Sequence, residues 1–179
     1  MNTKDLKDLY NLVLSDLHES IRKGTEQDTN QYERRIFVRN LFTTFETYIE
    51  LLKSELIDAL DYEYSNHKYK PDIGEILILE KRKFNVGKTG EYKESNLKLS
   101  LEQKIKFTLN LYCKIYIDDK DRWKSIDQYD NFWKALEIRN RVVHPKTISD
   151  YDISDDELGV VEDAQIFFIQ IIELNKSIT

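Results

Sequence analysis

Three side chains with complementary chemistry lie close together in the stretch Glu-Ile-Arg-Asn-Arg-Val-Val-His-Pro-Lys at positions 137–146: Arg139, Asn140 and His144. The guanidinium of an arginine presents a planar fork of donors that suits phosphate oxygens. An imidazole titrates near neutral pH and can accept a proton, and an amide can orient either group. Together these side chains could hold a phosphate group and move a proton beside it.

The helical pattern around these residues gives a reason to look beyond a charged surface. Phe132 and Leu136 follow helical spacing, and three or four further residues lead to Arg139 and Asn140. Polar groups at inward positions are costly unless they are paired or face a cleft. Either the apolar stripe stops where the helix enters solvent, or these residues line a polar pocket or interface. We favour the second interpretation.

Pro145 predicts where this helix ends. A proline disfavours helical geometry in the residue before it, so we expect His144 just past the helix end, free to turn back toward Arg139. A simpler interpretation stands beside this one. Arg139 and Arg141 near a helix C-terminus complement the helix dipole, and a nearby histidine can do the same.

The segment from Arg139 to His144 resembles the Arg-x(4–6)-His signature of the HEPN superfamily, in which a polar residue commonly follows the arginine. The resemblance extends loosely over most of the chain, because HEPN domains are helical bundles with the motif late in the sequence. Many members are metal-independent endoribonucleases of toxin–antitoxin, CRISPR-linked or other anti-phage systems. They usually act as dimers in which two motifs form one composite site. Other members lack catalysis and serve as binding or scaffolding modules.

This resemblance implies a role for each residue of the motif. His144 would be the general base that activates the 2′-hydroxyl of RNA, Arg139 would stabilise charge on the phosphate, and Asn140 would orient the phosphate or His144. It implies cyclic-phosphate products, no metal and no cofactor. It also implies a homodimer, with a possible antitoxin or defence-system partner protein. The alternative is a catalytically silent HEPN-like module that scaffolds another protein.

Basic residues in two places are candidates for holding the RNA backbone. Arg141 and Lys146 flank His144. A second group lies in residues 81–98, where six basic residues stand against two acidic ones. The candidates there are Lys81, Arg82, Lys83 and Lys88, and the aromatic rings of Phe84 and Tyr92 could stack on unpaired bases. A charged loop without function is the more common meaning of such a stretch.

Composition restricts where and how such a protein could act. A net charge of −6 over 179 residues disfavours non-specific adhesion to nucleic acid, so any RNA contact must be local. The single cysteine, Cys113, cannot form an internal disulfide, and its apolar neighbours indicate a buried thiol. No stretch approaches the ~20 apolar residues of a membrane span, and the N-terminus does not resemble a signal peptide. We expect a cytoplasmic protein without membrane contact.

Helical periodicity predicts the elements that position the motif. With only 5 glycines and 2 prolines, we expect an all-α chain, a single HEPN-like domain over residues 1–179 with about five helices. The second helix is long, and its Arg39 or Glu46 could reach the motif. The expected limits are a first helix ending at Gly24, a second starting near 28–31 and running to Tyr62, a third opening with a capping box at Ser100, a fourth starting near Asp127 and a fifth opening with a capping box at Ser154.

Residues 63–99 break this periodicity. They read as a long irregular insertion, with a short helix or extended piece at 73–84 and no convincing sheet. Such an insertion is either a functional loop or a mobile one.

Overall fold

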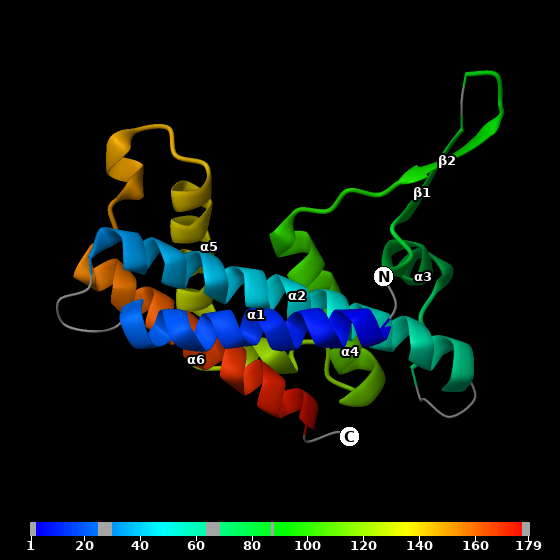
Figure 1. Ribbon diagram of the computed structural model, residues 1–179. Coiled ribbons are helices and arrows are strands. Elements are labelled where there is room, and N and C mark those ends of the chain that lie inside the picture. The colour runs from blue at the N-terminus through cyan, green and yellow to red at the C-terminus, as the bar shows by residue number, and fades with distance from the viewer. Residues whose placement is uncertain (1–2, 25–29, 64–68, 87, 177–179) are drawn as a thin grey trace. The chain divides into compact units, whose positions relative to one another are not determined.

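The computed structural model describes residues 3–24, 30–63, 69–86 and 88–176, and for residues 60–63, 85, 86 and 92 it describes only the backbone. The fold of these residues is mainly helical (Figure 1). The elements follow in the order α1 (Thr3–Gly24), α2 (Gln31–Glu63), α3 (Ile73–Leu79), β1 (Arg82–Val86), β2 (Tyr92–Asn96), α4 (Leu101–Tyr116), the 3₁₀ helix η1 (Arg122–Ser125), α5 (Tyr129–Val143), the 3₁₀ helix η2 (Ile148–Tyr151) and α6 (Asp155–Lys176).

The main helices begin and end close to the expected positions. The expectation that Gly24 ends the first helix is confirmed, and α2 runs without a break to Glu63. At the start of α4, the Ser100 side chain accepts from the Gln103 amide while the Gln103 side chain accepts from the Ser100 amide, which is the predicted capping box. Asn30 caps α2, and positions 28 and 29 of that start signal lie outside the described residues.

Within the expected insertion at 63–99, the short helix or extended piece predicted at 73–84 is present as α3 and the start of β1, whereas the expectation of no sheet is wrong. Asp72 opens α3 with a capping box that pairs its side chain with the Glu75 amide. β1 and β2 then form an antiparallel hairpin in which Arg82 pairs with Asn96 and Val86 with Tyr92. The described residues therefore hold six α-helices rather than five, and one two-stranded sheet. The sequence pattern missed the hairpin because neither strand has an apolar face long enough to show alternation.

Two compact units make up the chain. The first consists of residues 1–48 and 121–179, and the second of residues 49–120. Consequently α2 contributes its first half to one unit and its second half to the other. The motif at 139–144 belongs to the first unit, whereas the basic stretch at 81–98 belongs to the second.

Five phenylalanines form the centre of the first unit: Phe42 and Phe45 of α2, Phe132 of α5, and Phe167 and Phe168 of α6. Each is at most 2% exposed. The ring of Phe132 lies 4.8 Å from that of Phe45 and 4.6 Å from that of Phe167, and Phe45 meets Phe168 edge-on at 4.9 Å. Burying such a ring stabilises the fold by about 1.5–3 kcal/mol, and each aromatic pair adds about 0.5–1.5 kcal/mol. This aromatic cluster fixes α5 against α2 and α6.

Close backbone packing joins α1 to α2 within the same unit. A Cβ atom added to Gly24 would lie only 2.7 Å from Cβ of Phe37, so this position has no room for a side chain. Further along, the Thr44 hydroxyl donates to the Val13 carbonyl at 3.1 Å. Glycine thus both ends α1 and allows its last turn to approach α2.

The second unit has a smaller apolar core, made by α4 with the second half of α2 and the end of α3. Leu56, Leu79, Ile105 and Leu109 are at most 1% exposed. Cys113 is buried here too, as its apolar neighbours indicated. An ion pair of 2.7 Å between Lys114 of α4 and Glu75 of α3 adds to this packing.

We predict that Phe132→Ala lowers the free energy of unfolding by about 3–5 kcal/mol, because the change removes a buried ring and leaves a cavity between three helices. Urea denaturation followed by circular dichroism measures this difference. Ile148→Ala is the matched control, since Ile148 is 89% exposed and its loss should cost under about 0.5 kcal/mol. Equal costs for the two variants would contradict the central place of the aromatic cluster.

Candidate functional site

α5 presents the motif at the edge of its buried face. That face consists of Phe132, Ala135, Leu136, Ile138 and Val142. The apolar stripe therefore passes through Ile138 and Val142, so the expectation that Arg139 and Asn140 both point inward is wrong for Asn140, which is exposed. Arg139 is half-buried beside the stripe. The motif lies on the boundary between core and solvent, where a ligand can reach it.

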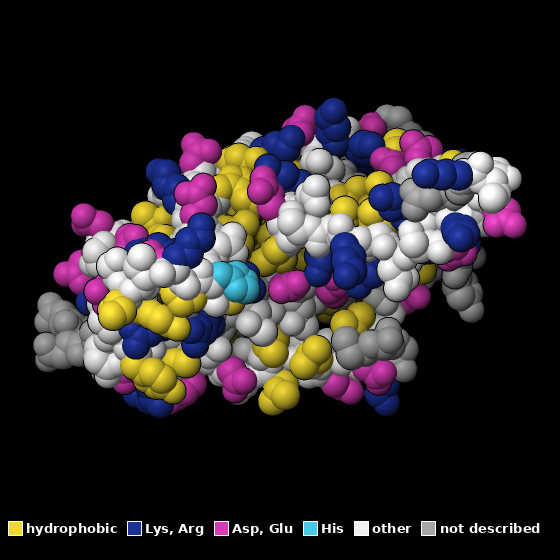
Figure 2. Space-filling view, turned by 90° about the horizontal axis from the view of Figure 1, so that it is seen from above, with side chains coloured by type: hydrophobic (Ala, Val, Ile, Leu, Met, Phe, Trp, Pro, Cys, Tyr) yellow, Lys and Arg dark blue, Asp and Glu magenta, His cyan; other side chains and the backbone are white. Residues whose placement is uncertain are grey.

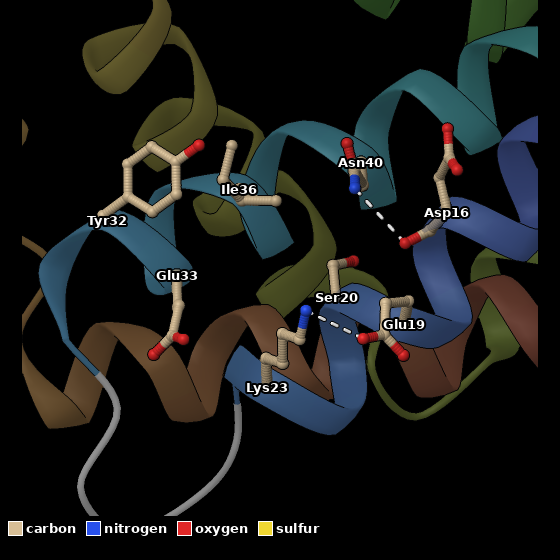
Figure 3. A pocket seen from close by; sticks show the side chains of 8 residues that line it. All are labelled: Asp16, Glu19, Ser20, Lys23, Tyr32, Glu33, Ile36 and Asn40. Carbon is tan, nitrogen blue, oxygen red and sulfur yellow. Dashed lines mark hydrogen bonds and ion pairs between the residues drawn. The ribbon is translucent and has the colours of Figure 1, made fainter.

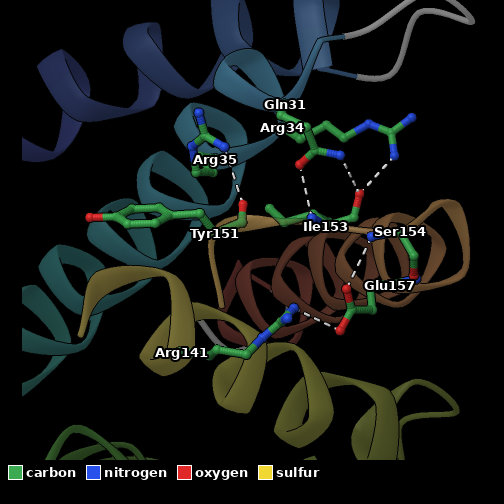
Figure 4. A network of polar contacts seen from close by, with 8 residues as sticks. All are labelled: Gln31, Arg34, Arg35, Arg141, Tyr151, Ile153, Ser154 and Glu157. Carbon is green, nitrogen blue, oxygen red and sulfur yellow. Dashed lines mark hydrogen bonds and ion pairs between the residues drawn. The ribbon is translucent and has the colours of Figure 1, made fainter. Parts of the chain in front are cut away.

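Arg139 has a single side-chain partner among the described residues. Its Nη1 donates to Oδ1 of Asn140 at 3.1 Å, and no carboxylate of the described part of the chain accepts from it. Arg141 differs, because its Nη2 lies 2.7 Å from Oε1 of Glu157 (Figure 4). The Asn140 contact holds the guanidinium in one orientation without neutralising it. Arg139 therefore keeps its charge and most of its donors available for an anion.

His144 stands just past the end of α5, as the proline predicts. It is the C-cap residue, its backbone (φ −125°, ψ 58°) is no longer helical, and its amide donates to the Asn140 carbonyl at 3.0 Å. The imidazole is exposed, and in the described residues it makes no hydrogen bond, including none to Arg139. The structure thus joins Arg139 to Asn140 directly and places His144 beside them through the backbone.

Polar side chains of α2 hold the segment that follows the motif (Figure 4). The Gln31 amide both donates to the Ile153 carbonyl and accepts from the Ile153 amide, each at 2.9 Å. Arg34 donates to the same carbonyl at 2.8 Å and forms a 2.6 Å ion pair with Asp155. Arg35 donates to the carbonyl of Tyr151 at 3.1 Å. These contacts, here named the α2 clamp, were not predicted, because their partners lie more than a hundred residues away and are mostly backbone atoms.

Arg39 brings a further positive charge to the end of α5. Its Nη2 donates to the Val142 carbonyl at 3.4 Å, so the expectation that Arg39 could reach the motif is confirmed. Carbonyls in the last turn of a helix lack helical partners and carry partial negative charge, which a guanidinium complements. Lys146, the other candidate near His144, is exposed, and its backbone amide donates to Asp150 at 2.7 Å.

The basic candidates of the second unit differ in their availability. Lys81 forms a 3.0 Å ion pair with Glu50, and Arg82 pairs with Glu94 at 2.8 Å and with Glu80 at 2.9 Å. Lys83 and Lys88 are exposed. The Arg82 guanidinium lies over the Phe84 ring at 5.1 Å, while the side chain of Tyr92 lies outside the described residues. Two of the four predicted RNA contacts are thus already engaged by carboxylates.

Charges of both signs are intermingled over the face that Figure 2 presents, with apolar patches between them. No extended basic surface covers this face. A polyanion would therefore meet local groups of cations on it, as the net negative charge already suggested.

A cleft between α1 and α2 is acidic and does not suit a phosphate (Figure 3). It has a volume of about 320 Å³, and its lining residues are Asp16, Glu19, Ser20, Lys23, Tyr32, Glu33, Ile36 and Asn40. Its only lysine, Lys23, pairs with Glu19 at 2.8 Å. Hydrogen bonds from Arg22 and Lys23 lower the pKa of Glu19 to about 2, so this carboxylate stays ionised. The cleft would repel RNA.

The described residues show neither a cluster of metal ligands nor a helix that could cross a membrane. They contain no group of three or more histidine, cysteine or acidic side chains arranged to hold a metal ion. Among their helices, none combines the length and the apolar character that crossing a membrane requires.

Comparison with protein-family models, with curated protein sequences and with solved structures finds no match to this chain.

We predict that Gln31→Ala loosens the segment after the motif, because it leaves both the amide and the carbonyl of Ile153 with fewer partners in a buried position. The free energy of unfolding should fall by about 1–3 kcal/mol, and the Ile153 amide should exchange faster with deuterium. Tyr32→Ala, next to it and 66% exposed, is the control and should change neither quantity much. Unchanged exchange at Ile153 in the Gln31 variant would show that the clamp does not hold the segment.

Proposed function

We propose that this protein is a metal-independent endoribonuclease of HEPN type, which cuts RNA at a site built from the ends of two α5 helices in a homodimer. The observation that carries the proposal is the open end of α5. There a half-buried arginine without a carboxylate partner in the described residues stands beside an exposed histidine. A charged, pre-oriented guanidinium and an accessible imidazole are what cleavage of RNA by its own 2′-hydroxyl requires.

In the proposed reaction His144 removes the proton of a ribose 2′-hydroxyl, whose oxygen attacks the adjacent phosphorus. The bond from phosphorus to the 5′-oxygen of the next nucleotide breaks, and that oxygen takes up a proton. The products are a 2′,3′-cyclic phosphate and a 5′-hydroxyl end. Arg139 stabilises the charge that builds on the phosphate oxygens, and Asn140 holds Arg139 in place. DNA has no 2′-hydroxyl and should not be cut.

The surroundings of the motif favour a negatively charged ligand. Arg39 contacts the last turn of α5, and Lys146 is exposed just after His144. Of the nearby cations, Arg141 is paired with Glu157. The remaining positive charge is local, which suits an overall acidic protein that binds RNA at one place only.

Two copies of the chain would explain one feature of the geometry. Within one chain His144 makes no hydrogen bond to Arg139 among the described residues, although both must reach one phosphate. In a dimer, His144 of one copy and Arg139 of the other can approach the phosphate from opposite sides. By resemblance to HEPN proteins, such an enzyme would act as a toxin or anti-phage effector, restrained or activated by a partner protein.

We predict that the purified protein cleaves a mixed RNA pool in the presence of EDTA and that His144→Ala lowers the rate about 100-fold or more, because the general base is lost. Cyclic-phosphate 3′-ends, detected by their resistance to periodate and to polymerase tailing, would identify the chemistry. His18→Ala is the matched control, since His18 is also an exposed histidine of the first unit. Arg139→Ala should be as defective as the His144 variant while its melting temperature stays near that of the wild type.

Equal cleavage by wild type and His144→Ala would point to a contaminating nuclease and contradict the proposal. So would cleavage that EDTA abolishes. If the folded dimer cuts none of the transfer, messenger and phage RNAs offered, alone or with a cell extract that supplies an activator, the catalytic proposal fails as well.

A second candidate function is a catalytically silent module that binds another protein chain. The observation that favours it lies on α6, where Ile166 and Ile169 are 43% and 45% exposed on the same side of the helix. Residues three apart on a helix are neighbours, so the two form an apolar patch rather than isolated positions. Such a patch can serve an interface in either function.

We predict that Ile166→Glu combined with Ile169→Glu weakens self-association by at least about tenfold, because two charges would have to be desolvated at the interface. Analytical ultracentrifugation over a concentration series measures the dimer constant. Ile148→Glu, at a position 89% exposed on η2, is the control for added charge. In the nuclease case cleavage should fall with the dimer. A wild type that stays monomeric at all concentrations would contradict the composite site.

A further inference from the structure

Three lysine side chains gather in the second unit around the carboxylate of Glu50. Lys81, which directly precedes β1, lies with its Nζ 3.0 Å from Oε2 of Glu50, and Lys104 of α4 lies 3.4 Å from Oε1. Lys53 follows Glu50 by three residues on α2, so the two side chains share one face of the helix. Three structural elements thus bring three lysines to one carboxylate.

The lysine cluster contains one carboxylate and three amines. Burial alone would raise the pKa of Glu50, but the hydrogen bond from Lys81 and the charges of Lys81, Lys53 and Lys104 lower it, so the carboxylate is ionised at neutral pH. One negative charge then stands against three amines.

Lys53 is the member that lacks a partner. The residue is only 9% exposed, and it makes no hydrogen bond or ion pair with any described residue. Its amine is not among the fully enclosed polar atoms, so solvent reaches it. Burial lowers its pKa to about 8, with the charges of Lys81 and Lys104 acting in the same direction and that of Glu50 opposing them. The protein holds this ammonium ion at a cost that an anion would offset.

We propose that Lys53, Lys81 and Lys104 form a binding site for a phosphate group beside Glu50. A phosphate carries up to two negative charges and strong acceptor oxygens, which suit three amines that approach from separate elements. Carboxylates of ordinary metabolites carry less charge per group and would fit the cluster less well. The site is distinct from the motif at the end of α5 and belongs to the other unit.

The phosphate could come from an RNA backbone or from a small polyphosphate. The β-hairpin favours the backbone, because Lys81 leads directly into β1 and the hairpin register places Lys83 and Lys93 on one face of the two strands. A strand of RNA held at the lysine cluster could continue along that face. The property common to both sources is recognition of a phosphate group.

The test is isothermal titration of the full-length protein with two probes at constant ionic strength and pH 7: inorganic pyrophosphate, and a 2′-O-methylated RNA oligonucleotide that no 2′-hydroxyl mechanism can cut. Lys53→Met keeps the buried stem and removes the charge, so binding should weaken about tenfold. Glu50→Gln should tighten binding several-fold, because it releases Lys81 and Lys104 from their carboxylate. Lys106→Met is the control, since Lys106 is an exposed lysine of α4 paired with Glu102.

A readout of the lysine itself separates binding from a change in folding. Nitrogen-15 resonances of the side-chain amines, followed from pH 6 to pH 11, should show the pKa of Lys53 rising when pyrophosphate is present, since a bound anion favours the charged amine. Circular dichroism confirms that each variant is folded. Should Lys53→Met destabilise the fold, Lys104→Met replaces it with the same expected loss.

Weaker binding of both probes by Lys53→Met would support a site that accepts a phosphate group from either an RNA backbone or a small polyphosphate. If only RNA binding weakens, the ligand of the site is an RNA backbone. If only pyrophosphate binding weakens, the ligand is a small phosphate compound. Unchanged binding in Lys53→Met and Glu50→Gln, or an unmoved pKa of Lys53, would overturn the proposal. Because neither probe is cleaved, these outcomes stand apart from any failure of the nuclease proposal.

Discussion

Packing among the phenylalanines of α2, α5 and α6 is the interaction on which the first unit depends. Phe132 touches rings from both neighbouring helices, so the position of α5 is set by contacts in its first half. The motif lies at the other end of the same rigid helix. Because the helix is rigid, packing of its first half also fixes the backbone position of Arg139 near its last turn. The core that fixes this position contains no polar group of the motif.

The two ends of α5 differ in burial and polarity. The first half of the helix buries Phe132, Ala135 and Leu136, while the last turn carries half-buried and exposed polar groups. A guanidinium fully inside the core would have required a buried carboxylate, and full exposure would have left it mobile. Arg139 at the boundary has Asn140 as its support and remains charged. The lysine cluster of the second unit follows the same principle with Lys53, whose stem is buried and whose amine reaches solvent.

Sequence reasoning predicted the parts of the fold that local rules control. Gly24, the capping boxes at Ser100 and Ser154, and Pro145 each act on their own neighbours, so the ends of α1, α4, α5 and α6 were predictable. Contacts between elements that are distant in the sequence could not be predicted in this way. Which side of α5 faces the core near its end depends on the elements that cover Ile138 and Val142. The hairpin depends on pairing between its two strands rather than on an apolar pattern within either strand. The α2 clamp joins positions about 120 residues apart, beyond the reach of any periodicity.

The α2 clamp has a consequence for how such a protein can evolve. Gln31, Arg34 and Arg35 contact main-chain atoms of Ile153 and Tyr151, and every amino acid except proline supplies both the amide and the carbonyl. Mutations in the loop between α5 and α6 can therefore change its side chains while the loop keeps its path. Exposed positions such as Ile148 can therefore be substituted without any compensating change in the helix that anchors the loop.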